Sequence, residues 1–307
     1  MAIPEAQLES WSHQGAVTTS KDTYATIKRA LESPNTGYAN RGYKIFLQGS
    51  YGNDTNIYAE SDVDVVICHT GVFFYDLGHL SAEESAAFKN QFGGGVDYNY
   101  ATFKADVQKA LVAAFGDSVE PPKKAFKIAA NGARRNADVV VAFEHRRYIE
   151  FKGHNNRSFY EGISFLTAAG TRIDNFPGYH SDNLTTKHQA TKGRFKPAVR
   201  IFKNMRSKAM ERGLLAKGEA PSYYVEGLLY NAPNTAFVGS FNDMVHAILV
   251  WLHAANDRTN FLCANERYYL LRDNEAVCWP KADGAKFISA MISLWNDWVE
   301  PPKIRFI

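Results

Sequence analysis

The sequence is poor in cysteine and has no long hydrophobic run. Its three cysteines, Cys68, Cys263 and Cys278, are an odd number without the spacing of a disulfide framework, which excludes a disulfide-stapled secreted fold and favours a reducing compartment. The most apolar helical stretch, 244–255, is too short to cross a bilayer, and residues 1–19 lack the apolar core of a signal peptide. We therefore expect a cytoplasmic protein without a membrane segment.

The sequence also lacks a strong charge of one sign. A formal net charge of +3 over 307 residues argues against a long nucleic acid as the main partner. The basic residues are nevertheless unevenly spread, and one segment contains Lys187, Lys192, Arg194, Lys196, Arg200, Lys203, Arg206, Lys208 and Arg212. This clustering favours an anionic ligand more than the total charge does.

Hydrophobic periodicity predicts an α+β fold with two lobes. Strands are expected at 43–47, 61–68, 124–129 and 138–143, and helices at 21–31, 81–91 and 100–115. After residue 160 come short β-like pieces, a loop around Asn175 to Gly178, and several helices from about residue 182 to the end. We expect a sheet-bearing lobe at 1–160, with an N-terminal helix, and a mainly helical lobe at 161–307.

One motif carries more information than any other part of the chain. Gln48-Gly49-Ser50 follows a predicted strand, and after a polar loop comes Ser61-Asp62-Val63-Asp64 at the head of a valine- and isoleucine-rich run. Asp62 and Asp64 are two residues apart, so on a strand their side chains leave the same face, roughly 6 to 7 Å from each other. Two carboxylates therefore lie beside a predicted phosphate loop.

This arrangement suits phosphoryl transfer, which needs donors for a triphosphate and carboxylates for divalent ions. Gly49 permits close approach of the backbone to phosphate, and Ser50 can begin a helix whose free N–H groups point at an anion. Asp62 and Asp64 would bridge two Mg²⁺ or Mn²⁺ ions, which prefer hard oxygen ligands.

Asp138 is the expected third carboxylate, because it heads its own apolar strand. Glu144 and Glu150 are weaker candidates, since they flank Arg146-Arg147 in what reads as a solvent-facing strand end. A Gly-Ser pair alone is an ordinary turn, and Asp-x-Asp alone is a solvated strand edge or a calcium-like loop. The ordered combination of the two motifs favours the catalytic interpretation.

These residues resemble the polymerase-β-like nucleotidyltransferases, whose signature is Gly-Ser, a loop and then Asp-x-Asp. Within that superfamily the chain is similar to the bacterial cGAS/DncV-like nucleotidyltransferases, and specifically to the CdnE-like branch that uses pyrimidines. The resemblance spans about residues 43–231, and its later segments contain Asn175-Phe176-Pro177, His180, residues 190–196, residues 199–204 and Pro221-Ser222-Tyr223-Tyr224-Val225-Glu226.

The resemblance implies a polymerase-β-like core sheet, a helical second lobe and an active site in the cleft between them. It also implies that nucleoside triphosphates, ATP and UTP among them, are joined with release of pyrophosphate into a cyclic dinucleotide, or a trinucleotide. Such products signal in bacterial anti-phage defence by acting on a separate effector protein. The implied setting is the bacterial cytoplasm.

The expected second lobe carries a basic stripe. Lys196, Arg200 and Lys203 fall at i, i+4 and i+7, so they share one face of a helix. A solvated basic face is the alternative reading of any such helix. The resemblance implies that Lys203 and Ser222 hold the donor triphosphate, with Lys196 and the Gln48-Gly49-Ser50 turn as further phosphate contacts.

Two further residues receive roles from the resemblance. Tyr223 would stack on the donor base, although core packing is its alternative. Asn175 would select uracil, because an amide both donates and accepts; its alternative is to cap a loop. A uridine-containing product, cyclic UMP-AMP or cyclic di-UMP, is therefore our first expectation.

Zinc is not expected. His246 and His253 are seven residues apart on one predicted helix, but no cysteine or acid cluster completes a site. The animal cyclic GMP-AMP synthase carries a zinc ribbon and is switched on by DNA, and this sequence has no such cysteine-histidine set. We expect no activation by DNA.

Three alternatives remain open from the sequence. In the first, the enzyme modifies another acceptor, such as an RNA 3′ end, a small molecule or a protein. In the second, it makes a purine-only cyclic dinucleotide. The third alternative is a non-catalytic nucleotide sensor that retained the fold.

Overall fold

The structure is a computed structural model that describes residues 2–15, 17–58, 62–95, 97–120, 124–255 and 257–299. The chain forms two compact units. We call Ala16–Gly52 with Ser61–Gly178 the core unit, and Met1–Gly15 with Asn53–Glu60 and Tyr179–Ile307 the helical unit. The boundary expected at residue 160 falls inside a strand, β6, whereas the units divide at residue 178. Among the described residues, none of the helices combines the length and apolar character needed to cross a membrane.

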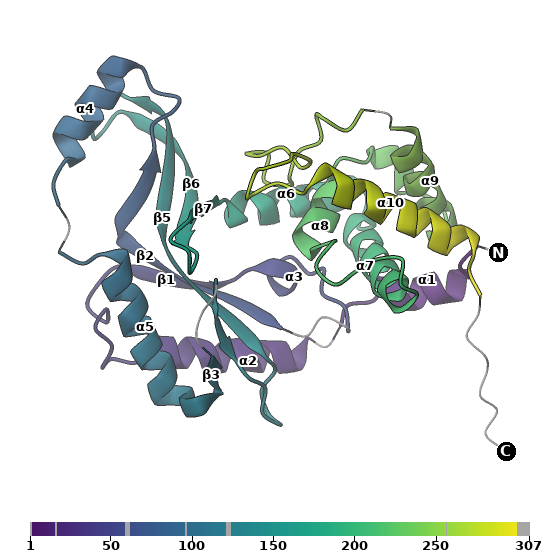
Figure 1. Cartoon of the computed structure of the whole chain (residues 1–307), viewed down its shortest axis with the longest axis horizontal. Coiled ribbons are helices and arrows are strands. Elements are labelled where there is room, and N and C mark those ends of the chain that lie inside the picture. Colours follow the sequence, from purple (N-terminus) through teal and green to yellow (C-terminus); the bar gives the residue numbers. More distant parts are fainter. Residues whose placement is uncertain are drawn as a thin grey trace. The chain divides into compact units, whose positions relative to one another are not determined.

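The secondary structure alternates early and becomes helical later (Figure 1). The strands are β1 (Tyr43–Leu47), β2 (Val63–Asp76), β3 (Val119–Glu120), β4 (Phe126–Ile128), β5 (Ala137–Phe151), β6 (Arg157–Leu166) and β7 (Arg172–Asn175). The helices are α1 (Glu5–Ser12), α2 (Thr18–Leu31), α3 (Gly49–Gly52), α4 (Ala82–Phe92), α5 (Tyr100–Phe115), α6 (Pro177–Ala190), α7 (Phe195–Glu211), α8 (Ser222–Tyr230), α9 (Phe241–Ala254) and α10 (Lys281–Asn296), with short 3-10 helices η1 (Gly116–Ser118) and η2 (Asn234–Ala236). The α+β prediction is confirmed.

The core unit is built on one mixed sheet. Its main path runs β1-β2-β5-β4-β3, and β6 pairs with β5 and with β7. The β2–β5 pairing is parallel, whereas the other strand pairings described are antiparallel. In Figure 1, α2 and α5 lie along the same side of this sheet. The long central strands β2 and β5 therefore set the geometry of the unit.

Alternation along β2 separates the two faces of the sheet. Val63, Val65 and Ile67 are fully buried in a core shared with α2 and α5. Asp64 and Val66 point to the opposite face, where Val66 contributes to a separate apolar cluster. Side chains alternate between the two faces of β2, so Asp64 points away from the main core.

β5 is longer than the sequence indicated. The predicted strand ended at Phe143, but β5 continues to Phe151, because β6 pairs with its second half. Glu144 is therefore only 8% exposed and accepts a hydrogen bond from Arg146 Nε at 2.6 Å. The prediction that Glu144 lies at a solvent-facing strand end is wrong.

The loop predicted around Asn175 to Gly178 is also wrong. Asn175 is the last residue of β7, and Pro177 is the first residue of α6. Proline fits this position because the first helical turn needs no intrahelical N–H and because its φ is already helical. The segment is therefore a direct strand-to-helix junction.

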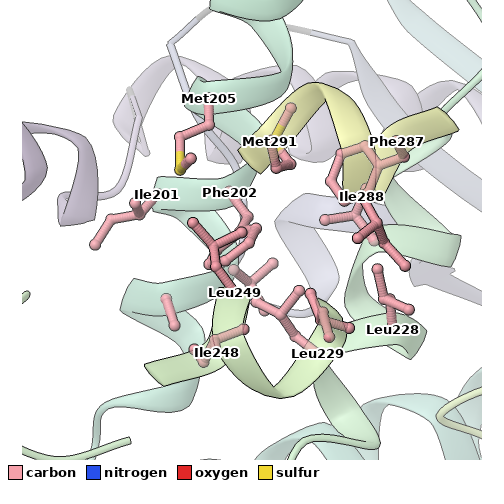
Figure 2. Close-up of a cluster of buried hydrophobic side chains, with 14 of the residues drawn as sticks. Ile201, Phe202, Met205, Leu228, Leu229, Ile248, Leu249, Phe287, Ile288 and Met291 are labelled. Atoms are coloured by element: carbon pink, nitrogen blue, oxygen red, sulfur yellow. The ribbon is translucent and has the colours of Figure 1, made fainter. Parts of the chain in front are cut away.

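The helical unit has its own core, drawn in Figure 2. Apolar side chains from four helices meet there, and those labelled are Ile201, Phe202 and Met205 of α7, Leu228 and Leu229 of α8, Ile248 and Leu249 of α9, and Phe287, Ile288 and Met291 of α10. Their spacing follows the helical repeat, so each helix buries one stripe. This core holds α7 and α8, which carry the predicted nucleotide-binding residues of this unit.

Candidate active site

Two of the predicted metal ligands are direct neighbours in the sheet. Asp64 of β2 and Asp138 of β5 are paired residues of the parallel ladder. Paired residues of adjacent strands lie about 4.8 Å apart and point to the same face. Asp62, two residues before Asp64, is exposed and immediately precedes β2. The fold therefore brings the three aspartates to one end of one sheet face.

Electrostatics couple two of these carboxylates. Burial raises the pKa of Asp138; the negative charge of Asp62 also raises it, and the positive charge of Lys127 opposes the shift. Lys127 lies on β4 opposite Asp138. A carboxylate whose pKa is raised by a like charge is one that a cation would stabilise.

The Gly-Ser turn packs directly against Asp64. The Gln48 N–H donates to the Asp64 carbonyl at 3.0 Å. Gly49 has a φ of +67°, and a Cβ added to it would lie only 2.2 Å from Asp64 Oδ2. Only glycine fits this cradle, for both conformational and steric reasons. Ser50 follows in the four-residue helix α3.

The donor chemistry of this end of the sheet fits divalent ions. Asp62, Asp64 and Asp138 provide hard carboxylate oxygens. Gln48 adds an Oε1 atom that is buried and accepts from none of the residues that the structure describes. Within the same described part of the chain, no three His, Cys, Asp or Glu side chains form a ready-made metal cluster. The aspartates are thus grouped by strand register, and their side chains would have to converge on an ion.

The predicted basic stripe of α7 contacts a loop within the helical unit. Lys196 Nζ donates to Asp54 Oδ2 at 3.0 Å, and Arg200 NH1 donates to the Asp54 carbonyl at 2.6 Å. Lys203 is fully buried, and its Nζ donates to the Thr55 carbonyl at 3.0 Å. The stripe is therefore no solvated face; it holds the loop that follows the Gly-Ser turn.

Ser222 and Tyr223 begin α8. Ser222 Oγ accepts a hydrogen bond from Arg206 NH1 at 3.2 Å, and Arg206 NH1 also donates to the Ala220 carbonyl at 2.6 Å. Burial lowers the pKa of the Arg206 guanidinium to about 10, against the opposing charge of Glu226. The buried guanidinium of Arg206 is thus hydrogen-bonded to Ser222, which is a predicted triphosphate contact.

Tyr223 is stacked on a second ring. The ring centroids of Tyr223 and His180 are 4.7 Å apart, with an interplanar angle of 18°. Tyr223 Oη accepts from Asn265 Nδ2 at 2.9 Å, which holds the far end of the side chain. The ring is therefore fixed in orientation, as a stacking platform requires.

Asn175 lies in the core unit with its amide oriented. Asn175 Oδ1 accepts from the Phe176 N–H at 2.9 Å. A backbone N–H can only donate, so this bond fixes which end of the amide is the oxygen. The bond joins Asn175 to the next residue of the strand-to-helix junction, and it leaves Nδ2 oriented as a donor.

Sequence reasoning assigned no role to the acid at the centre of the helical unit. Glu226 is 2% exposed and accepts hydrogen bonds from His180 Nε2, Asn53 Nδ2 and Thr55 Oγ1. Burial would raise the pKa of the Glu226 carboxyl, but the hydrogen bond and charge of His180, the charge of Lys203 and the hydrogen bond from Thr55 hold it below its usual range. The available signal was one acid among apolar residues of α8.

Known proteins resemble this chain over most of its length. The model of the cGAS/DncV-like nucleotidyltransferase C-terminal helical domain matches residues 182–296. The cyclic UMP-AMP synthase of Rhodothermus marinus is 36% identical over 97% of this chain and 99% of that protein. A cyclic dipyrimidine nucleotide synthase of Legionella pneumophila is 30% identical over 95% of this chain and 97% of its own length. A cyclic dipurine nucleotide synthase of Elizabethkingia meningoseptica is 32% identical over 82% and 85%.

A solved structure extends the likeness to three dimensions. The Rhodothermus marinus c-UMP-AMP synthase, solved with Apcpp and Upnpp, superposes with a TM-score of 0.85 at 34% identity, covering 99% of this chain and 100% of that one. Similarity at this identity over the whole length confirms the family resemblance and the nucleotidyltransferase assignment. The chain belongs to the cGAS/DncV-like nucleotidyltransferases.

Proposed function

We propose that this enzyme joins nucleoside triphosphates into a cyclic dinucleotide that contains uridine, with release of pyrophosphate at each step. The observation that carries the proposal is the register pairing of Asp64 with Asp138 beneath the Gly49 turn, in a chain similar over its whole length to a cyclic UMP-AMP synthase. A trinucleotide is a variant of the same chemistry. The product would act on a separate effector in anti-phage signalling in the bacterial cytoplasm.

The aspartates would hold two Mg²⁺ or Mn²⁺ ions. Bound there, such ions neutralise the triphosphate and activate the attacking hydroxyl. Asp62 and Asp64 would hold these ions, and Asp138 would complete the set of ligands. Burial raises the pKa of Asp138, which suits this carboxylate to accept the proton of the ribose hydroxyl.

The remaining predicted residues would align the nucleotides. The Gly49 turn admits phosphate oxygens close to the backbone, and the buried Gln48 Oε1 is suited to accept from a ribose hydroxyl or a metal-bound water. Lys203 and Ser222 are proposed as triphosphate contacts on the family pattern, with Lys196 beside them. Lys203 and Ser222 already have hydrogen-bond partners in the helical unit, the Thr55 carbonyl and Arg206 NH1. Phosphate binding would compete with these hydrogen bonds.

Asn175 is proposed to select the base. Its Oδ1 is engaged by the Phe176 N–H, so Nδ2 is the group offered to a nucleotide. A donor matches O4 of uracil and opposes the amino group that cytosine carries at the same position and adenine carries at C6.

Product analysis tests the proposal. The protein is incubated with Mg²⁺ and all four nucleotides without added acceptor, and the product is examined by mass and by phosphatase and nuclease sensitivity. A phosphatase-resistant product that contains uridine supports the proposal; a purine-only product corrects the base assignment. A product that forms only with an RNA, small-molecule or protein acceptor favours the other nucleotidyltransferase chemistry.

A double variant distinguishes an active enzyme from a non-catalytic nucleotide sensor. Asp62→Ala with Asp64→Ala should abolish pyrophosphate release and leave the melting temperature close to that of the wild type, because Asp62 is exposed and Asp64 is only half-buried. Unchanged turnover would refute the metal assignment. Asn175→Ser should retain pyrophosphate release while lowering the share of uridine in the product.

A further inference from the structure

A buried acid of the helical unit contacts both a loop and a histidine ring of that unit. Glu226 lies on α8 four residues after Ser222, so both are on one face of that helix. At its N-terminus α8 presents Ser222 and Tyr223, and one turn later it presents the Glu226 carboxylate to residues 53–55. Those residues follow the Gly-Ser turn and precede Asp62 in the chain.

The carboxylate organises the loop through two donors of that loop. Asn53 Nδ2 donates to Oε2 at 3.2 Å, and Thr55 Oγ1 donates to Oε1. On the other side of the loop, Lys203 Nζ donates to the Thr55 carbonyl. A carboxylate buried to this degree persists only when its lone pairs are satisfied and a cation is near, and here both conditions hold.

The same carboxylate also orients a ring. His180 Nε2 lies 2.7 Å from Glu226 Oε2, and the His180 ring stacks on Tyr223. His180 is 3% exposed, and its Nδ1 has no hydrogen-bond partner among the residues that the structure describes, so the bond from Nε2 to Glu226 is what orients the imidazole. The orientation of Tyr223 therefore depends on Glu226 through one intervening side chain.

We propose that Glu226 is a positioning residue that sets both the loop leading to Asp62 and Asp64 and the ring of Tyr223. This inference rests on the roles proposed for the aspartates and the tyrosine. Glu226 would touch neither metal nor nucleotide. It would make the binding of the ion and the stacking of the base depend on one buried charge.

Glu226→Gln is the direct test. The amide keeps the shape of the side chain but loses the charge that faces Lys203, and it places a donor where donors already converge. Outer-shell changes of this kind typically weaken metal affinity or activity about 10- to 100-fold. We expect at least a ten-fold rise in the Mg²⁺ concentration for half-maximal pyrophosphate release, a rise in KM for the donor nucleotide, and faster amide exchange in peptides that span 50–58.

Two single changes should divide these effects. Thr55→Val removes the loop hydroxyl and should raise the Mg²⁺ requirement with little change in nucleotide KM. His180→Ala removes the ring behind Tyr223 and should raise nucleotide KM with little change in the Mg²⁺ requirement. A merely structural Glu226 would not produce this division.

Leu229→Ala is the stability-matched control. Leu229 is buried in the same helix but faces the apolar core, so its loss lowers the melting temperature without touching the loop. If Leu229→Ala changes loop exchange and the Mg²⁺ requirement as Glu226→Gln does, or if Glu226→Gln changes neither, the positioning role is refuted. Loop exchange needs no turnover, so a wild-type protein that made no cyclic product would overturn the proposed function and still allow this test.

Discussion

Replacement of Gly49 by alanine should separate activity from stability. The added Cβ would lie 2.2 Å from Asp64 Oδ2 and 3.0 Å from its Cγ. Real Cβ contacts shorter than 3.0 Å essentially never occur, so the carboxylate or the turn must move by about 0.8 Å. Misplacement of a reacting group by about 1 Å costs roughly 100-fold in rate. We therefore expect pyrophosphate release to fall by about two orders of magnitude.

The loss of stability should be much smaller. A non-glycine residue at a φ of +67° costs roughly 1–2 kcal/mol, which corresponds to a fall of a few degrees in melting temperature for a chain of this size. Initial rates at saturating Mg²⁺ and nucleotide, measured beside a thermal melt, give both quantities on the same preparation. The variant should remain folded at the assay temperature.

Gly170→Ala supplies the matched control. Gly170 also has a positive φ, +79°, and is exposed, but a Cβ there meets nothing within 4 Å. It should show a similar loss of melting temperature and keep its activity. If Gly49→Ala retains more than half of the wild-type rate, the reasoning from the Asp64 contact is wrong. Equal losses of activity in both variants would show that backbone strain, and not the clash, is responsible.

Three further predictions concern charge. Lys127→Met removes a positive charge that lowers the pKa of Asp138, so the pKa of Asp138 should rise further. The acidic limb of the rate–pH profile should then move to higher pH. A limb that does not move would exclude Asp138 as the titrating base. Arg206→Lys replaces the planar guanidinium whose NH1 donates to both the Ala220 carbonyl and Ser222 Oγ. The donor KM should therefore rise several-fold at unchanged kcat, as separated by steady-state kinetics. Lys203→Met removes one cause of the low Glu226 pKa. That carboxyl stabilises the fold above its ordinary pKa and loses this contribution as pH falls through the folded value, so the melting temperature of the variant should begin to fall at a higher pH than in the wild type.

Local patterns predicted the elements that hold most of the core-unit site. The bounds of β1, Tyr43–Leu47, and of α5, Tyr100–Phe115, are those predicted from periodicity. The helix α5 begins after Asn99, whose side chain accepts from the Thr102 N–H, and ends before Gly116. Such signals lie within a few residues of the element that they define, so they can be recognised in a single sequence.

The full length of β5 and the burial of Lys203 were harder to predict from the sequence. The second half of β5 is polar in sequence, and it is a strand because β6 pairs with it. Lys203 reads as part of an exposed basic stripe, yet it is fully buried against the Thr55 carbonyl. A side chain's charge does not reveal whether a distant segment supplies the acceptor that makes burial tolerable.

The sequence by itself determined which residues are candidates for the chemistry of this protein: a glycine turn, two carboxylates at a spacing of two and a third at the head of another strand. These features depend on residue type and on the period of a strand, which are local properties. Only the tertiary structure decided that Asp138 pairs with Asp64, that residues 53–58 belong with the helical unit, and that Glu226 and not solvent receives their donors. Register, burial and hydrogen-bond partners arise from segments far apart in the chain, so they are decided when those segments pack.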